Sequence, residues 1–206
     1  MHPHDISPFA LIHPKAQIGK RVAIGAGTVI GEGTIIEDDV SIGGNCFIGG
    51  PPESKNHWDD FKFRVLIEKK AVISNLVTID SGTERFTTVG ESSIILAHAH
   101  LGHDAILFKH CTVACGVTIG GFVVLMEHVN VGLNVSIHQK KIIPPYVMLG
   151  MGTVVTKHSV LGAYRSYAGN PCSELGMNKA FSPTTRQHVL KNKDYLKLRG
   201  KMHDHF

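Results

Sequence analysis

The segment LAHAHLGHD, residues 96–104, holds the side chains of this chain that are best suited to acid–base chemistry. It contains His98, His100 and His103, and Asp104 follows directly. An imidazole titrates near neutral pH, and a neighbouring carboxylate can fix its tautomer and raise its basicity. We therefore predict that His103 is a general base supported by Asp104, whereas we assign His98 to solvent.

A six-residue repeat must position these side chains. An isoleucine recurs at every sixth residue from Ile12 to Ile48, and the residue two positions before each is small or β-branched. Two further registers, at 67–79 and 89–161, are apolar at every sixth position. Self-similarity at a fixed short period is typical of a β-solenoid, in which each repeat buries its inward residue by stacking on its neighbours. Three hexads make a coil of eighteen residues, so residues i and i+18 should stack about 4.8 Å apart.

The stacking rule predicts which residues accompany His103. Because Leu101 occupies an inward position, the histidines around it should point outward. Gly121 lies eighteen residues after His103, where the absence of a side chain leaves a backbone N–H accessible to a developing oxyanion. Gln139, next to His138, lies a further eighteen residues along. The sequence thus predicts one face that carries the histidine, the glycine and the glutamine.

The repeat changes phase twice, between Ile48 and Ile67 and between Ile79 and Val89. The first break contains two prolines and the only tryptophan, and the second, SGTERFTT, is short and polar. Both should be loops, and loops that interrupt a solenoid are suited to build a site.

Length and composition favour one main domain with a small appendage. With 206 residues, we place a β-helix at 1–178 and a short basic helical extension at 179–206. The net charge is +4, and the excess of basic residues lies in this tail. The basic residues therefore do not indicate a nucleic-acid-binding surface, and we expect no nucleic-acid partner. The four cysteines show no metal-type spacing, and no apolar run is long enough to span a bilayer. We expect a cytoplasmic protein without stable membrane insertion.

The motif AHLGHD resembles the active-site motif of the UDP-N-acetylglucosamine acyltransferases that begin lipid A synthesis, within the hexapeptide-repeat acyltransferase superfamily. The spacing from His103 to the His138-Gln139 pair matches that family, and VTIDSGT resembles its VTIHRGT segment. The resemblance runs from about Ile12 to Asn178. It implies an all-β, left-handed parallel β-helix and a homotrimer, in which a second protomer completes each site.

The resemblance also implies roles for individual residues. His103 would deprotonate a sugar hydroxyl, Asp104 would support it, and the Gly121 N–H would lie in the oxyanion hole. The residues implied to bind the nucleotide sugar are Asp60, Lys62, His100, His138, Gln139 and Asn178. Met151 occupies the position that limits acyl length in the family, and its bulk implies a short to medium acyl chain.

The chain departs from the family at several positions. Phe122, Asp80 and Pro171 stand where the family has histidines. The C-terminal region is also much shorter than the family's helical domain, which helps to bind acyl carrier protein. Its basic helix could hold an acidic carrier protein or the phosphates of coenzyme A, or could simply form a solvated cap.

We therefore predict an acyltransferase of the EC 2.3.1 type, without a bound cofactor or metal. It would move an acyl group from acyl carrier protein or acyl-CoA to a nucleotide sugar, by 3-O-acylation of the UDP-N-acetylglucosamine type. An acetyl-CoA-dependent N-acetyltransferase on a nucleotide-linked amino sugar is the alternative, favoured by Met151, GNPC and the short tail. A carbonic-anhydrase-like metalloenzyme would use the His98 and His103 spacing, but no histidine lies two coils earlier, near Lys62. The remaining hypothesis is that the protein is a scaffold without catalytic activity.

Overall fold

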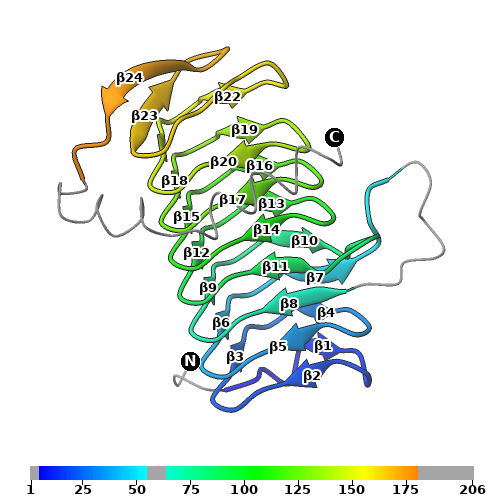
Figure 1. Cartoon of the computed structure of the whole chain (residues 1–206). Coiled ribbons are helices and arrows are strands. Elements are labelled where there is room, and N and C mark those ends of the chain that lie inside the picture. Colours follow the sequence, from blue (N-terminus) through cyan, green and yellow to red (C-terminus); the bar gives the residue numbers. More distant parts are fainter. Residues whose placement is uncertain (1–4, 55–63, 181–206) are drawn as a thin grey trace.

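The chain is an all-strand parallel β-solenoid in the computed structural model, which describes residues 5–54 and 64–180. The strands stack in three sheets, which form the faces of a triangular prism (Figure 1). Within these two ranges there is no helix. The helix predicted after residue 179 falls almost entirely outside the described residues, so it stays a prediction.

Most strands contain only two residues, and each face of the prism takes every third strand. The first sheet contains β1 (Leu11–Ile12), β4 (Val29–Ile30), β7 (Phe47–Gly50), β10 (Thr78–Asp80), β13 (His100–Leu101), β16 (Thr118–Ile119), β19 (Ser136–Ile137) and β22 (Val154–Val155). The second sheet contains β2 (Gln17–Ile18), β5 (Ile35–Ile36), β8 (Val65–Ile67), β11 (Thr87–Val89), β14 (Ile106–Leu107), β17 (Val124–Leu125) and β20 (Ile142–Ile143). The third sheet contains β3 (Ala23–Ile24), β6 (Ser41–Ile42), β9 (Val72–Ile73), β12 (Ile94–Ile95), β15 (Thr112–Val113), β18 (Asn130–Val131), β21 (Met148–Leu149), β23 (Arg165–Ala168) and β24 (Ser173–Met177).

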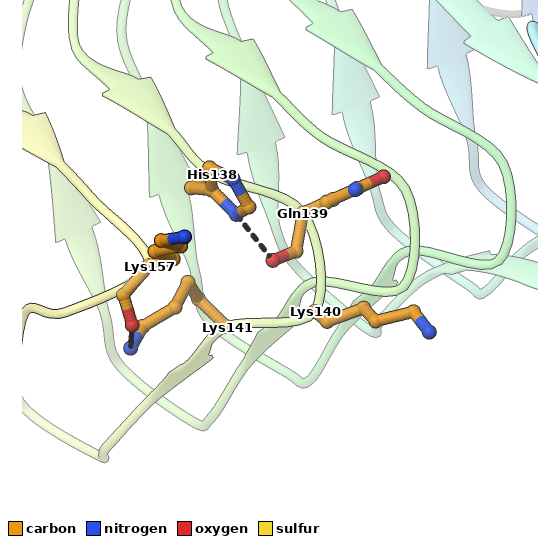
Figure 2. A pocket seen from close by; sticks show the side chains of 5 residues that line it. All are labelled: His138, Gln139, Lys140, Lys141 and Lys157. Carbon is orange, nitrogen blue, oxygen red and sulfur yellow. Dashed lines mark hydrogen bonds between the residues drawn. The ribbon is translucent and has the colours of Figure 1, made fainter. Parts of the chain in front are cut away.

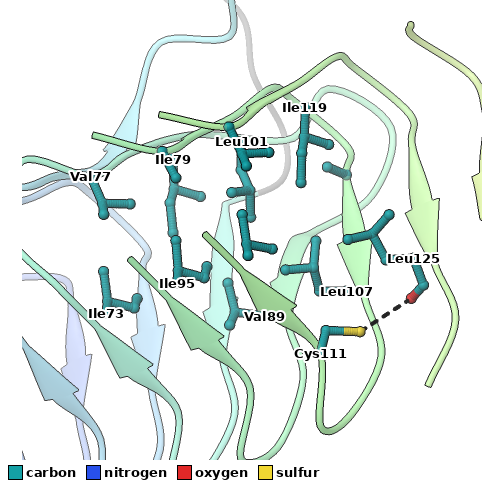
Figure 3. Packing of buried hydrophobic residues seen from close by; sticks show 14 of the residues in the cluster. Ile73, Val77, Ile79, Val89, Ile95, Leu101, Leu107, Cys111, Ile119 and Leu125 are labelled. Atoms are coloured by element: carbon teal, nitrogen blue, oxygen red, sulfur yellow. Dashed lines mark hydrogen bonds between the residues drawn. The ribbon is translucent and has the colours of Figure 1, made fainter. Parts of the chain in front are cut away.

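The core of the solenoid is the column of inward hexad residues predicted from the repeat. Leu101 pairs with Ile119, and Ile119 with Ile137, each eighteen residues further along. Figure 3 shows such residues stacked inside the prism, where Leu101 and Ile119 have no exposed surface. Burying each such side chain contributes about 1.5–3 kcal/mol, which favours this register over a one-residue slip. Ile12 and Ile18 are only partly buried, since they lie in the first coil and have no complete coil beneath them.

Both predicted loops leave the solenoid at the same corner, between the first and second sheets. Across the first loop, Ile48 pairs with Ile79, an offset of 31 residues in place of eighteen, so the loop inserts thirteen residues. Across the second, Ile79 pairs with Leu101 at an offset of 22, which is an insertion of four. The stacking continues beyond each insertion, because the loops project outward and leave the inward column in place.

The repeat ends differently from the prediction. Leu161, the last expected inward residue, lies outside the strands but packs against the core, and Tyr167, six residues further, is buried in β23 and continues the column. β23 adds to β21 in parallel, and β24 then turns back to pair with β23 in antiparallel orientation. This final hairpin pairs β23, which would otherwise be left with one open edge.

A ladder of four aromatic rings runs along the corner between the second and third sheets. His110, His128, Tyr146 and Tyr164 stack in successive coils, with ring centroids 4.8, 4.7 and 5.0 Å apart. All four have positive φ angles near 60°, as the second residue of a tight corner turn. The coil period therefore aligns residues of the corner turns as strictly as it aligns the core.

Candidate active site

The site corner, defined as the turns 81–86, 102–105, 120–123 and 138–141 that join the first sheet to the second, collects most of the predicted site residues. Backbone hydrogen bonds connect these turns: the Phe122 N–H donates to the His103 carbonyl (2.9 Å) and the Lys140 N–H to the Gly121 carbonyl (2.8 Å). The turns therefore form a regular stack whose outward side chains lie side by side.

His103 and Asp104 form a hydrogen-bonded pair at this corner. Nδ1 of His103 lies 2.7 Å from Oδ2 of Asp104. The Asp104 side chain is fully buried, and that of His103 is 13% exposed. An ionised carboxylate can only accept, so Nδ1 carries the proton and Nε2 keeps its lone pair. This is the tautomer that a general base requires.

The shorter loop surrounds the Asp104 carboxylate with donors. The backbone N–H groups of Thr83, Glu84 and Arg85 and the Thr83 hydroxyl all donate to it, at 2.8–3.0 Å. Burial alone would raise the pKa of Asp104, but the hydrogen bonds from His103 and from these amides outweigh it and hold the pKa far below its ordinary value. Asp104 therefore stays ionised throughout the physiological pH range.

Gly121 lies directly against the imidazole of His103. A Cβ atom built on Gly121 would lie 2.7 Å from His103 Nε2 and 2.9 Å from Cε1. Gly121 is a buried residue, and its N–H donates to no other described residue. A Cβ on Gly102 would approach the Gly121 nitrogen to 2.8 Å, so both glycines keep this amide uncovered. A backbone donor therefore lies beside the basic nitrogen, as an oxyanion site requires.

Phe122, one of the departures from the family motif, forms one wall beside His103. The two rings meet edge to face, with centroids 5.2 Å apart. The Arg85 guanidinium lies 5.6 Å from the Phe122 ring centroid, and Lys140 Nζ lies 5.7 Å from it. The Phe122 ring has no titratable group, so its contact with His103 shields and orients the imidazole. Its π face also attracts the two cations.

His100 and Asp80 lie on the first sheet, next to the site corner. His100 Nδ1 is 2.8 Å from the Thr78 hydroxyl, and its Nε2 is 3.9 Å from Asp80 Oδ2. Burial raises the pKa of Asp80 to about 6, although His100 and the Glu53 amide act against this rise. Asp80 thus places a buried carboxylate beside His100.

His138 and Gln139 border an open cavity of about 280 Å³, together with Lys140, Lys141 and Lys157 (Figure 2). His138 Nδ1 donates to the Gln139 carbonyl at 2.9 Å, which leaves Nε2 as an acceptor. Lys141 Nζ donates to the Ser159 carbonyl at 2.6 Å, and burial lowers the pKa of this lysine. Lys140, Lys141 and Lys157 thus give this cavity a positively charged wall, which the sequence motifs do not predict.

Other predicted site residues lie elsewhere. Met151 is 75% exposed in the turn between the third and first sheets, at a different corner of the prism from His103. Asn178 follows β24 at the outer edge of the third sheet, where its amide donates to the Tyr146 carbonyl (3.0 Å) and accepts from the Ala180 N–H (3.1 Å). Within this protomer it therefore anchors the final hairpin. Asp60 and Lys62 lie outside the described residues.

The sequence reasoning also missed Thr83, Arg85 and Glu53. Thr83 and Arg85 belong to the loop that it did predict, but their contact with Asp104 depends on how that loop folds back. Glu53 lies in the described part of the first loop, and its N–H donates to Asp80 at 3.3 Å. No spacing rule connects these positions, since an insertion breaks the coil period.

The fold and this corner place the chain in the class of left-handed parallel β-helices built from hexapeptide repeats. Residues 15–50 match the family described as bacterial transferase hexapeptide, six repeats. More specifically, the chain is similar to the UDP-N-acetylglucosamine O-acyltransferases within this class.

Three relatives illustrate the similarity. The acyl-(acyl-carrier-protein)-UDP-N-acetylglucosamine O-acyltransferase of Stutzerimonas stutzeri is 28% identical over 118 residues, which is 56% of this chain and 45% of the relative. The corresponding enzyme of Campylobacter lari is 36% identical over 63 residues, 29% of this chain and 24% of the relative. These matches thus span less than half of the length of the relatives. The crystal structure from Acinetobacter baumannii superimposes with a TM-score of 0.70 at 27% identity, over 89% of this chain and 81% of that one.

A membrane-crossing helix is also not found: no helix in the described part of the chain has the length and apolar character to cross a bilayer.

Proposed function

We propose that this protein transfers an acyl group from acyl carrier protein or coenzyme A to a hydroxyl of a nucleotide sugar, of the UDP-N-acetylglucosamine 3-O-acylation type. The observation that carries this proposal is the arrangement at the site corner. A buried carboxylate holds the His103 tautomer, and the uncovered Gly121 N–H lies beside the free Nε2. The similarity to UDP-N-acetylglucosamine O-acyltransferases supports the same chemistry.

The proposed reaction begins when His103 Nε2 accepts the proton of the acceptor hydroxyl. The sugar oxygen then attacks the thioester carbonyl of the donor, and the carbonyl oxygen becomes an oxyanion that accepts a hydrogen bond from the Gly121 N–H. Collapse of this tetrahedral intermediate breaks the C–S bond. The departing thiolate takes the proton from the His103 imidazolium, so His103 returns to its neutral form.

Asp104 has two tasks in this scheme. Its hydrogen bond fixes the Nδ1–H tautomer before the reaction, and its negative charge stabilises the imidazolium that forms during it. The surrounding amides of residues 83–85 keep the carboxylate ionised and rigid. The proton therefore remains on the imidazole and is not passed to Asp104.

A homotrimer is part of this proposal. The site corner lies on the outside of one prism, and Met151, the proposed limit of the acyl pocket, lies at another corner. Three copies around a threefold axis would bring the Met151 corner of one protomer to the His103 corner of the next. Light scattering with size-exclusion chromatography should give three times the chain mass, and a monomer would contradict the shared site.

The substrate roles of His100, His138, Gln139, Asn178, Asp60 and Lys62 are proposals as well. His138 and Gln139 are the best placed of the described ones, because they follow His103 by two coils and border the basic cavity. The lysines of that cavity suit a phosphate of the donor or of the nucleotide.

The decisive experiment compares His103→Ala with His98→Ala, an exposed histidine five residues away. Donors linked to carrier protein and to coenzyme A are each offered with UDP-N-acetylglucosamine and with a 3-amino analogue, and products are identified by mass spectrometry. His103→Ala should lower turnover by about 10²–10⁴-fold, as loss of a general base does, while the protein still folds. His98→Ala should retain full turnover.

Two results would contradict the proposal: full turnover in His103→Ala, or no acylated product from any donor–acceptor pair. Bound zinc in the parent, together with no acylated product from any pair, would instead support the carbonic-anhydrase-like hypothesis. The pairing that gives product also identifies the acceptor.

N-acetyl transfer from acetyl-CoA is the second candidate, favoured by Met151. A bulky side chain at the proposed pocket limit suits a two-carbon group better than a long acyl chain. An acetylated amine as the sole product would establish this candidate in place of O-acylation.

A further inference from the structure

Three potential metal ligands converge beside the site corner, and the proposed acyl transfer does not use them as a group. One ligand atom each of Glu53, Asp80 and His100 lies within 4.8 Å of the others. Glu53 is exposed, Asp80 is buried, and His100 is intermediate. Two carboxylates and an imidazole are oxygen and nitrogen ligands of the kind that bind divalent metal ions.

Asp80 is the buried member of this group and has few partners among the described residues. Its side chain is only 9% exposed, yet within the described residues one oxygen has no hydrogen-bond partner and the other accepts a single long bond (3.3 Å) from the Glu53 N–H. None of the described lysines or arginines forms an ion pair with Asp80 or Glu53. A buried carboxylate beside a second carboxylate is costly unless a positive charge compensates it.

His100 is oriented as a metal ligand is. Its Nδ1 is 2.8 Å from the Thr78 hydroxyl, a contact that fixes the ring and directs Nε2 toward Asp80. Ligating histidines commonly use their second ring nitrogen in this way. The separation of 3.9 Å between Nε2 and Asp80 Oδ2 is too long for a hydrogen bond. It is within the roughly 4.2 Å that two ligands, each about 2.1 Å from the same ion, can span.

We propose that Glu53, Asp80 and His100 bind one divalent metal ion, of the Zn²⁺ or Mn²⁺ class, next to the proposed catalytic base. The Glu53 carboxylate is exposed and supplies the third ligand. Three protein ligands leave at least one coordination position open for water or an oxygen of a bound substrate. Metal binding as such does not depend on the proposed acyl transfer.

The test measures metal content in the full-length chain. His2, His4, His203 and His205 are first replaced by alanine, because histidines near both ends could bind metal unspecifically. The purified protein is loaded with Zn²⁺ alone or Mn²⁺ alone and dialysed, and bound metal is measured by elemental mass spectrometry. Affinity is measured by calorimetry.

The variants are Asp80→Asn and Glu53→Gln, and the control is Glu91→Gln. Glu91 is a partly exposed carboxylate that pairs with Lys69 at 3.6 Å, at the corner between the second and third sheets. We expect about one ion per chain in the parent and the control, and at least a tenfold loss of affinity in both variants. Glu53→Gln changes an exposed side chain, so it tests the site even where Asp80→Asn disturbs folding.

Two results would overturn the proposal: no ion retained by the parent, or equal affinity in Glu53→Gln and Glu91→Gln. His103→Ala separates this inference from the proposed function, since it should lose turnover and keep the ion. Loss of the ion in His103→Ala would assign the metal to the base itself and also refute the three-residue site.

Discussion

Replacing Gly121 by alanine tests whether the base and the oxyanion donor are neighbours, as the site corner implies. The φ angle of Gly121 lies outside the left-handed region, so the backbone accepts alanine without strain. The new methyl carbon would nevertheless lie 2.7 Å from His103 Nε2, 2.9 Å from Cε1 and 3.1 Å from Cδ2. Ordinary contacts of a Cβ begin at 3.4 Å, so the imidazole has to retreat.

The size of the effect follows from this retreat. The imidazole must move by about 0.7 Å at Nε2, away from the amide that would bind the oxyanion. Misplacement of a reacting group by about 1 Å costs roughly 10²-fold in rate. We therefore expect kcat/KM to fall by about 10²-fold, which corresponds to about 2.7 kcal/mol of transition-state stabilisation. The fall should appear in kcat, because the substrate contacts remain.

The assay is acyl transfer with the active donor and acceptor pair, followed by mass spectrometry, with thermal unfolding as a check on the fold. Gly162→Ala is the matched control, because its Cβ would meet nothing closer than 3.7 Å. It should retain the parental rate. A Gly121→Ala enzyme that works as fast as Gly162→Ala would refute the contact between Gly121 and the base, and with it the proposed oxyanion donor.

Three further predictions concern other parts of the molecule. Asp104→Ala leaves two buried donors of Thr83 without an acceptor, and each such donor costs about 1–3 kcal/mol. The variant should therefore have a free energy of unfolding lower by about 2–6 kcal/mol in urea titrations. Folding lowers the pKa of Asp104, so the stability difference between parent and variant should be largest above pH 3.8 and should shrink as the pH falls toward the pKa of folded Asp104. A stability difference that stays constant down to pH 2 would contradict this prediction. Burial, with a smaller effect of His110, lowers the pKa of His128, so the parent should lose stability as the pH falls below about 6.5. In melting curves, His128→Phe should abolish this loss. An equal loss in parent and variant would argue against His128. Met151→Gly should shift the preferred donor toward longer acyl chains in competition assays, and an unchanged product distribution would exclude Met151 as the pocket limit.

The fold could be predicted from the sequence almost in full. The six-residue period specifies which residue of each strand is buried, and the eighteen-residue coil specifies the strand pairing, as in the pairs Leu101 with Ile119 and Ile119 with Ile137. The prediction was wrong only at its end: Leu161 packs against the core as expected, but the buried column continues to Tyr167.

The part of the site that follows the coil period was also accessible to prediction. His103, Gly121 and Gln139 lie in successive turns of one corner, because their spacing equals one coil. The donors around Asp104 were not accessible, since the four inserted residues shift the register and the loop closes on the carboxylate through its own path. Asn178 shows the same limit: the hairpin after β23 directs its side chain to the Tyr146 carbonyl.

The sequence by itself determined the solenoid, its core and the alignment of His103 with Gly121, because a repeat converts spacing along the chain directly into position in space. Only the tertiary structure decided that both insertions leave from the same corner and that residues 83–85 donate hydrogen bonds to Asp104. It also decided that Glu53 lies close to Asp80 and His100. These contacts join segments whose separation is not a multiple of the coil. Their geometry comes from how the loops fold back on the prism, which no local periodicity encodes.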